Sequence, residues 1–184
     1  MPDVTNLQDF LETAWQTLRT GIADGKSPAR YPTFATVSPN GLPEARTVAL
    51  RRASRSEALV EVHTDIVTPK MKSLHAFPHA ALHVWVPRSD LQIRLTTTVT
   101  ILTGADVDTQ WGQVPPASRV SYGTKPDPGL PIAGAFDYEK PPVRDRFAVL
   151  RCAVDHIDLV HLGEQHRRAE YSRHNNWQGT WLSP

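Results

Sequence analysis

Cysteine is nearly absent from this sequence: the 184 residues include one, Cys152. A single cysteine excludes a disulfide within the chain and a cluster of thiolate metal ligands. The residues around it are apolar and typical of a strand, so we expect Cys152 to be part of the core. No stretch approaches the roughly 20 consecutive apolar residues that a membrane-spanning helix needs.

An excess of charge of one sign is also missing. Twenty Lys and Arg face nineteen Asp and Glu, for a formal net charge of +1. This balance argues against a nucleic-acid-binding domain. Any bound anion must therefore be held by basic side chains close to it. Residues 1–10 lack the basic start and apolar stretch of a secretory signal. We therefore expect a cytoplasmic protein whose partners include neither nucleic acid nor a membrane.

Several catalytic motifs are absent as well. The sequence has no G-x-S-x-G, no P-loop and no G-x-G-x-x-G, which removes the usual arguments for a hydrolase, an NTPase or a Rossmann dinucleotide site. His79 and His83 could share one face of a strand, but no third ligand lies at a metal-binding spacing. No metal site is predicted.

What is present indicates a β-rich chain. Apolar residues at helical spacing predict a helix over 5–20, with Thr5 or Asn6 as N-cap, followed by a loop over 21–30. From residue 31 the pattern changes to short strands, and Asn40-Gly41 predicts a hairpin because both residues tolerate positive φ. The predicted strands cover 33–37, 45–52, 58–64, 80–86, 91–102, 147–162 and 168–171, with a last strand ending at residues 181–182.

Helical pieces interrupt these strands. Thr68-Pro69 predicts a helix start that should stop before Pro78. Short helical segments are expected at 106–111 and 117–122, and the proline-rich stretch 125–142 is expected to be an irregular loop. Antiparallel strands with inserted helices, and no βαβ alternation, predict a mainly β fold: a small barrel in a single domain over 1–184, with a helix in 1–20 and the barrel in 31–184.

Three arginines lie in one predicted strand, Ala45–Arg52. Alternation would place Arg46 and Arg52 on the same face as Val48 and Leu50, and Arg51 on the other face. A charge beside apolar residues needs compensation, which a bound phosphate would supply. The alternative is an exposed edge strand whose arginines are solvated or paired with carboxylates.

Two further positions could serve an anionic, flat ligand. Lys70 lies in the first turn of the predicted helix, against the usual dipole preference, and a nearby anion would explain it. Gln92 on the strand 91–102 offers a donor and an acceptor to the edge of a ring such as a flavin. The alternative is that both side chains are solvated.

In order along the chain, these segments resemble the pyridoxamine 5'-phosphate oxidase-like family of FMN-binding split barrels, from about Tyr31 to the C-terminus. The similar segments are Arg46-Thr47-Val48-Ala49-Leu50-Arg51, His63-Thr64, Thr68-Pro69-Lys70, Phe77-Pro78-His79-Ala80-Ala81-Leu82, Gln92-Ile93, and the closing Arg168, Tyr171 and Trp177–Pro184. The resemblance implies a homodimer with FMN at the subunit interface and two-electron flavin chemistry on a small substrate.

The resemblance also implies roles for residues. Arg46 and Lys70 would hold the FMN phosphate, Gln92 would meet the flavin ring, and Arg168 would approach from the partner chain. The cofactor would be lined by Thr47, Val48, Leu50, Arg51, His63, Thr64 and Thr68. Substrate contacts would come from Arg119, Ser121 and His166.

The chain departs from the family pattern mainly on the substrate side. Arg51 stands where the oxidase has a lysine, Glu164-Gln165-His166 replaces an Arg-Leu-His turn, and Pro69 replaces a basic residue. An FMN-dependent oxidoreductase is the leading hypothesis. The alternatives are a protein that binds a flavin or another flat cofactor without vitamin B6 oxidase activity, and a barrel with no cofactor.

Overall fold

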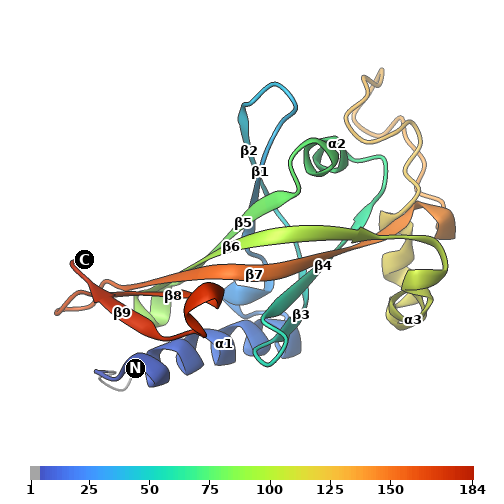
Figure 1. Ribbon diagram of the computed structural model, residues 1–184. Helices are drawn as coiled ribbons and strands as arrows, with labels where there is room; N and C mark the ends of the chain where they lie inside the picture. The colour runs from blue at the N-terminus through green and yellow to red at the C-terminus, as the bar shows by residue number, and fades with distance from the viewer. Residues whose placement is uncertain (1–4) are drawn as a thin grey trace.

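The computed structural model describes residues 5–184, which form one nine-stranded, antiparallel sheet with helices around it (Figure 1). The first four residues of the segment 1–20 lie outside this range. The strands are β1 (Thr33–Val37), β2 (Pro43–Thr47), β3 (Leu50–Ser54), β4 (Leu59–Asp65), β5 (His79–Val86), β6 (Leu91–Leu102), β7 (Phe147–His161), β8 (Arg167–Ser172) and β9 (Gly179–Leu182). The helices are α1 (Leu7–Ala23), α2 (Pro69–Ala76) and α3 (Asp108–Gln113), with 3-10 turns η1 (Pro28–Arg30), η2 (Pro87–Ser89), η3 (Gly104–Val107), η4 (Pro116–Ser121), η5 (Arg144–Arg146) and η6 (Arg173–Asn175).

Chain connectivity requires this sheet to close on itself. The hydrogen-bonded order is β2-β1-β5-β6-β7-β4-β3, with β8 and β9 branching from β7. In a flat sheet β2 and β3 would lie six strand spacings apart, roughly 29 Å. Only Val48 and Ala49 separate the two strands in sequence, which allows at most about 11 Å between the Cα atoms of Thr47 and Leu50. The sheet therefore curls into a barrel whose open seam lies between β2 and β3.

The predicted strand 45–52 is therefore wrong in one respect, because it is two strands. Residues up to Thr47 pair with β1, whereas residues from Leu50 pair with β4, across a register shift between Leu50 and Arg52. The break and the shift interrupt the alternation that was expected to align Arg46, Leu50 and Arg52 on one face. Most other predicted segments are confirmed within a few residues, and the strand 91–102 coincides with β6.

The barrel interior holds the main core, and α1 closes it from below in Figure 1. Asn6 caps α1, since its side chain accepts hydrogen bonds from the backbone N–H groups of Gln8 and Asp9. The buried stripe of α1 consists of Phe10, Leu11, Ala14, Trp15, Leu18 and Gly21. A second apolar cluster forms where α3 and its flanking turns cover the outside of β7; it contains Val107, Val114, Tyr122, Phe147 and Val149. No helix within residues 5–184 has the length and apolar character needed to cross a membrane.

Gly21 is required where α1 meets η1. A β-carbon at this position would lie 2.5 Å from the carbonyl carbon of Ala29, a distance that backbone atoms cannot tolerate without moving. A β-carbon at Gly112 in α3 would meet nothing within 4 Å. The two glycines of α1 and α3 therefore differ in the space around them.

We predict that Gly21→Ala lowers the free energy of unfolding by about 1–3 kcal/mol, because overpacking outweighs the better helix propensity of alanine. The control, Gly112→Ala, should be neutral or stabilising by up to about 1 kcal/mol. Urea denaturation followed by circular dichroism measures both. Equal effects of the two substitutions would refute the packing argument.

Candidate functional site

Arg46 lies on β2, on the side of the β1–β2 hairpin that α2 faces. Its guanidinium donates to the Thr36 hydroxyl at 2.7 Å, the Phe34 carbonyl at 3.3 Å and the Glu44 carboxylate at 2.9 Å. The side chain is three-quarters buried. Its orientation is therefore fixed by β1 and β2.

Lys70 comes to the same region from α2. Thr68 is the N-cap residue and Pro69 takes the first helical position, as predicted, but no side-chain cap bond forms there. The Lys70 ammonium instead donates to the hydroxyls of Thr64 at 2.8 Å and Thr68 at 3.1 Å. Within residues 5–184, no carboxylate forms an ion pair with this ammonium.

The electrostatics of Lys70 reflect this arrangement. Burial, with a contribution from the nearby charge of Arg46, lowers the pKa of Lys70 from 10.5 to about 8, and Asp65 opposes the shift. The charge of Arg46 thus acts against the charged form of Lys70. The pair suits an anion, which would relieve both the repulsion and the desolvation.

Glu44 and Ser73 tie α2 to the hairpin. The buried Ser73 hydroxyl donates to the Glu44 carboxylate at 2.8 Å, and that carboxylate also receives Arg46. The Ser73 hydrogen bond, followed by Arg46, holds the pKa of Glu44 below its usual value. Glu44 thus fixes Arg46 relative to α2.

The turn before α2 is held by a buried carboxylate. Asp65 accepts from the backbone N–H of Val67 at 3.0 Å, that of Gly123 at 2.9 Å and Arg146 Nε at 2.8 Å. Arg146 also pairs with Asp127 at 2.9 Å. This network connects the turn that carries Thr68 and Lys70 to the start of the proline-rich loop.

Arg51 and His63 lie on the other face of the β3–β4 wall. His63 and Thr64 are successive residues of β4, so their side chains point to opposite faces of the strand. His63 therefore points away from the Thr64 hydroxyl that Lys70 contacts. The two residues line a pocket of about 280 Å³ together with Ile22, Arg30, Gln113, Val114 and Pro115. The His63 ring packs edge-on against Phe147, with 4.9 Å between the ring centroids.

Gln92 and Arg168 belong to a third part of the sheet. They share one lateral row, Gln92 on β6, Val160 on β7 and Arg168 on β8. Gln92 contacts His83 at 3.3 Å, and Arg168 pairs with Asp158 at 2.8 Å. Within one chain these two residues form a group separate from Arg46 and Lys70.

The predicted substrate residues lie on two segments: Arg119 and Ser121 in η4, and His166 between β7 and β8. The guanidinium of Arg119 donates to the carbonyls of Val114 and Trp111 and stacks 5.0 Å from the centroid of the Trp111 ring, so it stabilises its own turn. Ser121 is exposed at the end of η4. His166 is exposed between β7 and β8.

The remaining predicted cofactor residues lie at the barrel seam. Thr47 is exposed at the end of β2, whereas the side chains of Val48 and Leu50 are buried in the core. Only the backbone of Val48 and Leu50 is therefore suited to face a ligand.

Four residues that contribute to the site were not predicted from the sequence: Thr36, Glu44, Ser73 and Arg30. Of these, Glu44 could have been found, because it lies two residues before Arg46 on the same strand face.

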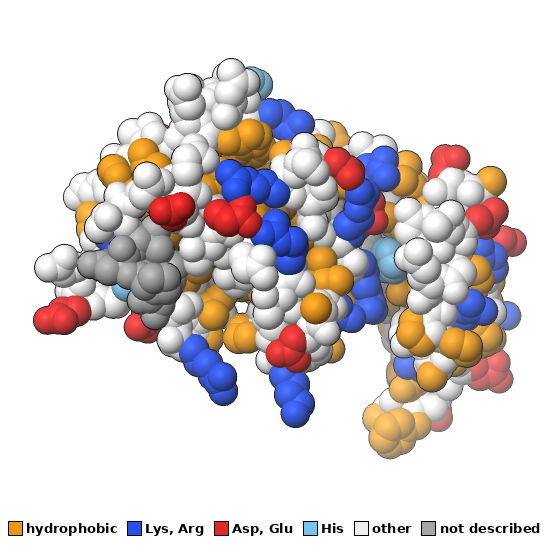
Figure 2. Space-filling view, turned by 90° about the horizontal axis from the view of Figure 1, so that it is seen from below, with side chains coloured by type: hydrophobic (Ala, Val, Ile, Leu, Met, Phe, Trp, Pro, Cys, Tyr) orange, Lys and Arg blue, Asp and Glu red, His pale blue; other side chains and the backbone are white. Residues whose placement is uncertain are grey.

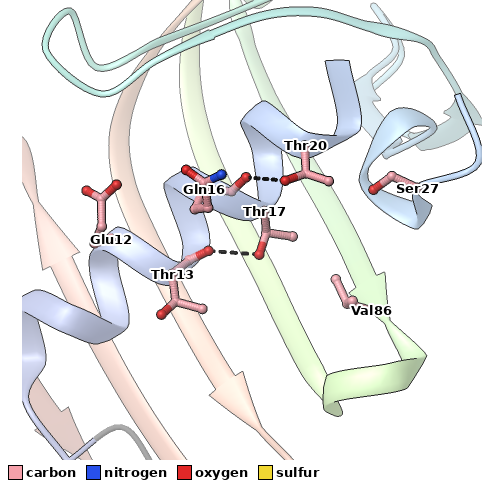
Figure 3. Close-up of a pocket in the computed structure, with 7 residues that line it drawn as sticks. All are labelled: Glu12, Thr13, Gln16, Thr17, Thr20, Ser27 and Val86. Carbon is pink, nitrogen blue, oxygen red and sulfur yellow. Dashed lines mark hydrogen bonds between the residues drawn. The ribbon is translucent and has the colours of Figure 1, made fainter. Parts of the chain in front are cut away.

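Two other hollows lack the features of such a site. One, of about 430 Å³, is lined by Glu12, Thr13, Gln16, Thr17, Thr20, Ser27 and Val86 (Figure 3). The hydroxyls of Thr17 and Thr20 donate within α1 and are already satisfied. The other is lined by Arg19, Arg52, Ala53, Ser54, Arg55 and Ser56. Its arginines pair with Glu12, Glu57 and Glu61, and Figure 2 shows basic and acidic groups interspersed on this lower face.

The cations on β2 and α2 suit an anionic ligand. Comparisons with known proteins specify the class. The family model for the pyridoxamine 5'-phosphate oxidase, FMN-binding domain, matches residues 12–103, half of the chain. The chain belongs to this family, whose domain binds FMN. A search of curated proteins gave no match.

Solved structures agree on the fold. A pyridoxamine 5'-phosphate oxidase-related, FMN-binding protein from Nostoc punctiforme is 23% identical, with a TM-score of 0.76 over 94% of this chain and 96% of that one. PhzG from Burkholderia lata, in complex with tetrahydrophenazine-1-carboxylic acid, is 18% identical, with a TM-score of 0.70 over 100% and 95%. A heme-binding protein from Mycobacterium smegmatis is 16% identical, with a TM-score of 0.51 over 84% of this chain and 57% of that one. The chain thus has the split-barrel fold, as predicted.

Proposed function

We propose that this chain binds FMN and acts as an FMN-dependent oxidoreductase that accepts a hydride from a small substrate. The observation that carries the proposal is that two partly buried cations, Arg46 and Lys70, lie on elements that the Ser73–Glu44 hydrogen bond joins. Arg46 pairs with Glu44, whereas no carboxylate within residues 5–184 forms an ion pair with Lys70. A phosphate group is the anion that such a pair suits. Membership of the family supports FMN as its source.

FMN would supply the two-electron acceptor, and the protein would supply binding and orientation. Arg46 and Lys70 would hold the phosphate, with Thr64 and Thr68 directing the ammonium toward it. The backbone at Thr47, Val48 and Leu50, at the barrel seam, would lie along the cofactor. No side chain in this scheme needs to form a covalent bond.

We also propose that the functional unit is a homodimer. Gln92 and Arg168 lie in a row apart from Arg46 and Lys70, so one copy alone does not gather all predicted cofactor residues around a single ligand. In a dimer, Arg168 of one copy would reach the cofactor held by the other. A cytoplasmic location remains a prediction from the sequence.

A second candidate function is a cofactor-binding protein without vitamin B6 oxidase activity. The hydrogen bonds of Arg119 within its own turn favour it, because they leave fewer of its donors for a substrate. The fold also accommodates other ligands, since relatives include a heme-binding protein.

The purified protein should be yellow, with the absorption spectrum of bound oxidised flavin, or become so on addition of FMN. A colourless protein that does not bind added FMN would refute flavin binding. Pyridoxamine 5'-phosphate given to the FMN-loaded protein, with peroxide as the readout, separates the two candidate functions. Peroxide formation supports vitamin B6 oxidation, and its absence with flavin bound supports the second candidate.

We predict that Arg46→Ala weakens FMN binding by about 10- to 100-fold, since losing a charged hydrogen-bond partner costs roughly 1.5–3 kcal/mol. Arg52→Ala is the control, because Arg52 pairs with Glu57 and Glu61 away from this cluster. Quenching of flavin fluorescence measures both affinities. If the two variants bind FMN equally well, Arg46 does not hold the phosphate.

Lys70 makes FMN binding dependent on pH. With a pKa of about 8 in the free protein, its ammonium is mostly charged at pH 7.5 and mostly neutral at pH 9, whereas a bound phosphate keeps the proton to higher pH. We expect the Kd for FMN to rise about eightfold between these pH values. Lys70→Arg stays charged throughout and should lack this rise. Parallel pH profiles for the two proteins would contradict the assignment.

A further inference from the structure

Asp65, the last residue of β4, has no role in the scheme proposed for FMN, yet it is only 3% exposed. A buried carboxylate is unfavourable unless hydrogen bonds and a cation compensate its charge. Asp65 obtains this compensation from two parts of the molecule. One is the turn that leads to Lys70, and the other is the base of the proline-rich loop, which extends away from the barrel in Figure 1.

Asp65 reaches Lys70 through Thr68. The backbone carbonyl of Asp65 accepts hydrogen bonds from the Thr68 hydroxyl at 2.8 Å and from the Thr68 backbone N–H at 3.2 Å. A hydroxyl has one proton, so when Thr68 donates to Asp65 its lone pairs can accept from the Lys70 ammonium, which lies at 3.1 Å. The Asp65 carboxylate fixes the same turn, since it accepts from the backbone N–H of Val67 at 3.0 Å. Asp65 therefore sets the direction of the hydroxyl that holds Lys70.

The same carboxylate fixes the base of the loop. Its Oδ2 accepts from the backbone N–H of Gly123 at 2.9 Å, and its Oδ1 accepts from Arg146 Nε at 2.8 Å. Arg146 also pairs with Asp127 inside the loop at 2.9 Å. Gly123 has a φ of +133°, and a β-carbon there would lie 2.3 Å from the carbonyl oxygen of Pro141. The loop base is thus closely packed at the point where Asp65 holds it.

We propose that Asp65 is a positioning residue for the phosphate site: it holds the Thr68 turn against the base of the loop and so places the Lys70 ammonium for an anion. The proposal rests on the proposed function, because the anion is taken to be the phosphate of FMN. Asp65 acts through Lys70 and does not contact the anion, which a carboxylate would repel.

The charge of Asp65 also acts on Lys70. Arg46 on β2, itself paired with Glu44, lowers the pKa of Lys70, whereas Asp65 raises it. Loss of the carboxylate would therefore lower this pKa further below about 8, and the ammonium would lose its proton at a lower pH. If Asp65 were only a structural support, its loss would loosen the turn and expose Lys70. The pKa would then move back toward 10.5.

Asp65→Asn tests the proposal in the full chain, because an amide keeps the size of the side chain, removes its charge and offers one accepting oxygen in place of two. Quenching of flavin fluorescence measures the Kd for FMN. We expect the Kd to rise about five- to tenfold at pH 7.5, and the pH at which binding weakens to fall. The control is Asp127→Asn, which removes the other ion pair of Arg146. It should change the Kd by less than about twofold, since Asp127 is half exposed.

A double-mutant cycle determines whether Asp65 acts through Lys70. In a Lys70→Met background, Asp65→Asn should raise the Kd by about twofold or less, whereas in an Arg46→Ala background it should keep most of its effect. Equal effects in the two backgrounds would overturn the proposal. So would a rise in the pH at which binding weakens.

Melting curves determine whether Asp65→Asn folds. If it does not, Thr68→Val decides, since it removes the hydroxyl that lies between Asp65 and Lys70. A loss of FMN affinity that disappears in the Lys70→Met background would support the proposal, and an unchanged Kd would overturn it.

A wild-type protein that does not bind FMN would refute the proposed function alone. The pKa of Lys70 can still be followed by NMR in FMN-free protein that contains isotope-labelled lysine, with Lys70→Arg identifying the resonance. It should fall in Asp65→Asn. A rise, or no change, would overturn the role of Asp65.

Discussion

The two-residue link between β2 and β3 is the constraint on which the rest of the structure depends. Because Val48 and Ala49 join the two ends of the strand order, the sheet must close, and its seam falls where the backbone of Val48 lies. α2 is then tied to both strands, to β2 through the Ser73–Glu44 hydrogen bond and to β4 through the hydrogen bond of Lys70 to Thr64.

Local signals predicted most of the secondary structure. The Asn40-Gly41 hairpin, the Thr68-Pro69 helix start and the strand 91–102 depend on neighbouring residues and on alternation, and the structure agrees with them. The split of the strand 45–52 could not be predicted in this way. It arises because residues on either side of Val48 pair with strands at opposite ends of the sheet, and such pairing is decided by contacts that are distant in sequence.

The residues of the candidate site that could be predicted from the sequence are the charged ones in unusual positions. Arg46 and Lys70 stood out because a cation in an apolar strand and a lysine at a helix start both lack an evident partner. Ser73 and Arg30 gave no such signal in the sequence, since their roles follow from the packing of α2 on the hairpin and of η1 on α1. The substrate-binding residues were the hardest to predict. Arg119 forms a hydrogen bond and a ring contact within its own turn, and these contacts are visible only in the folded structure.

The length of β7 has a consequence for motion. One edge of this strand serves β4 along residues 147–153 and β8 along residues 156–161, so the β8–β9 hairpin is an appendage of the barrel rather than part of its wall. The hairpin is fastened to α1 by the Tyr171 hydroxyl, which donates to the Leu7 carbonyl at 2.7 Å, and by the stacking of Phe10 on Trp181. We therefore expect the hairpin and the first turns of α1 to move together, so that a displacement of either would carry Arg168 with it.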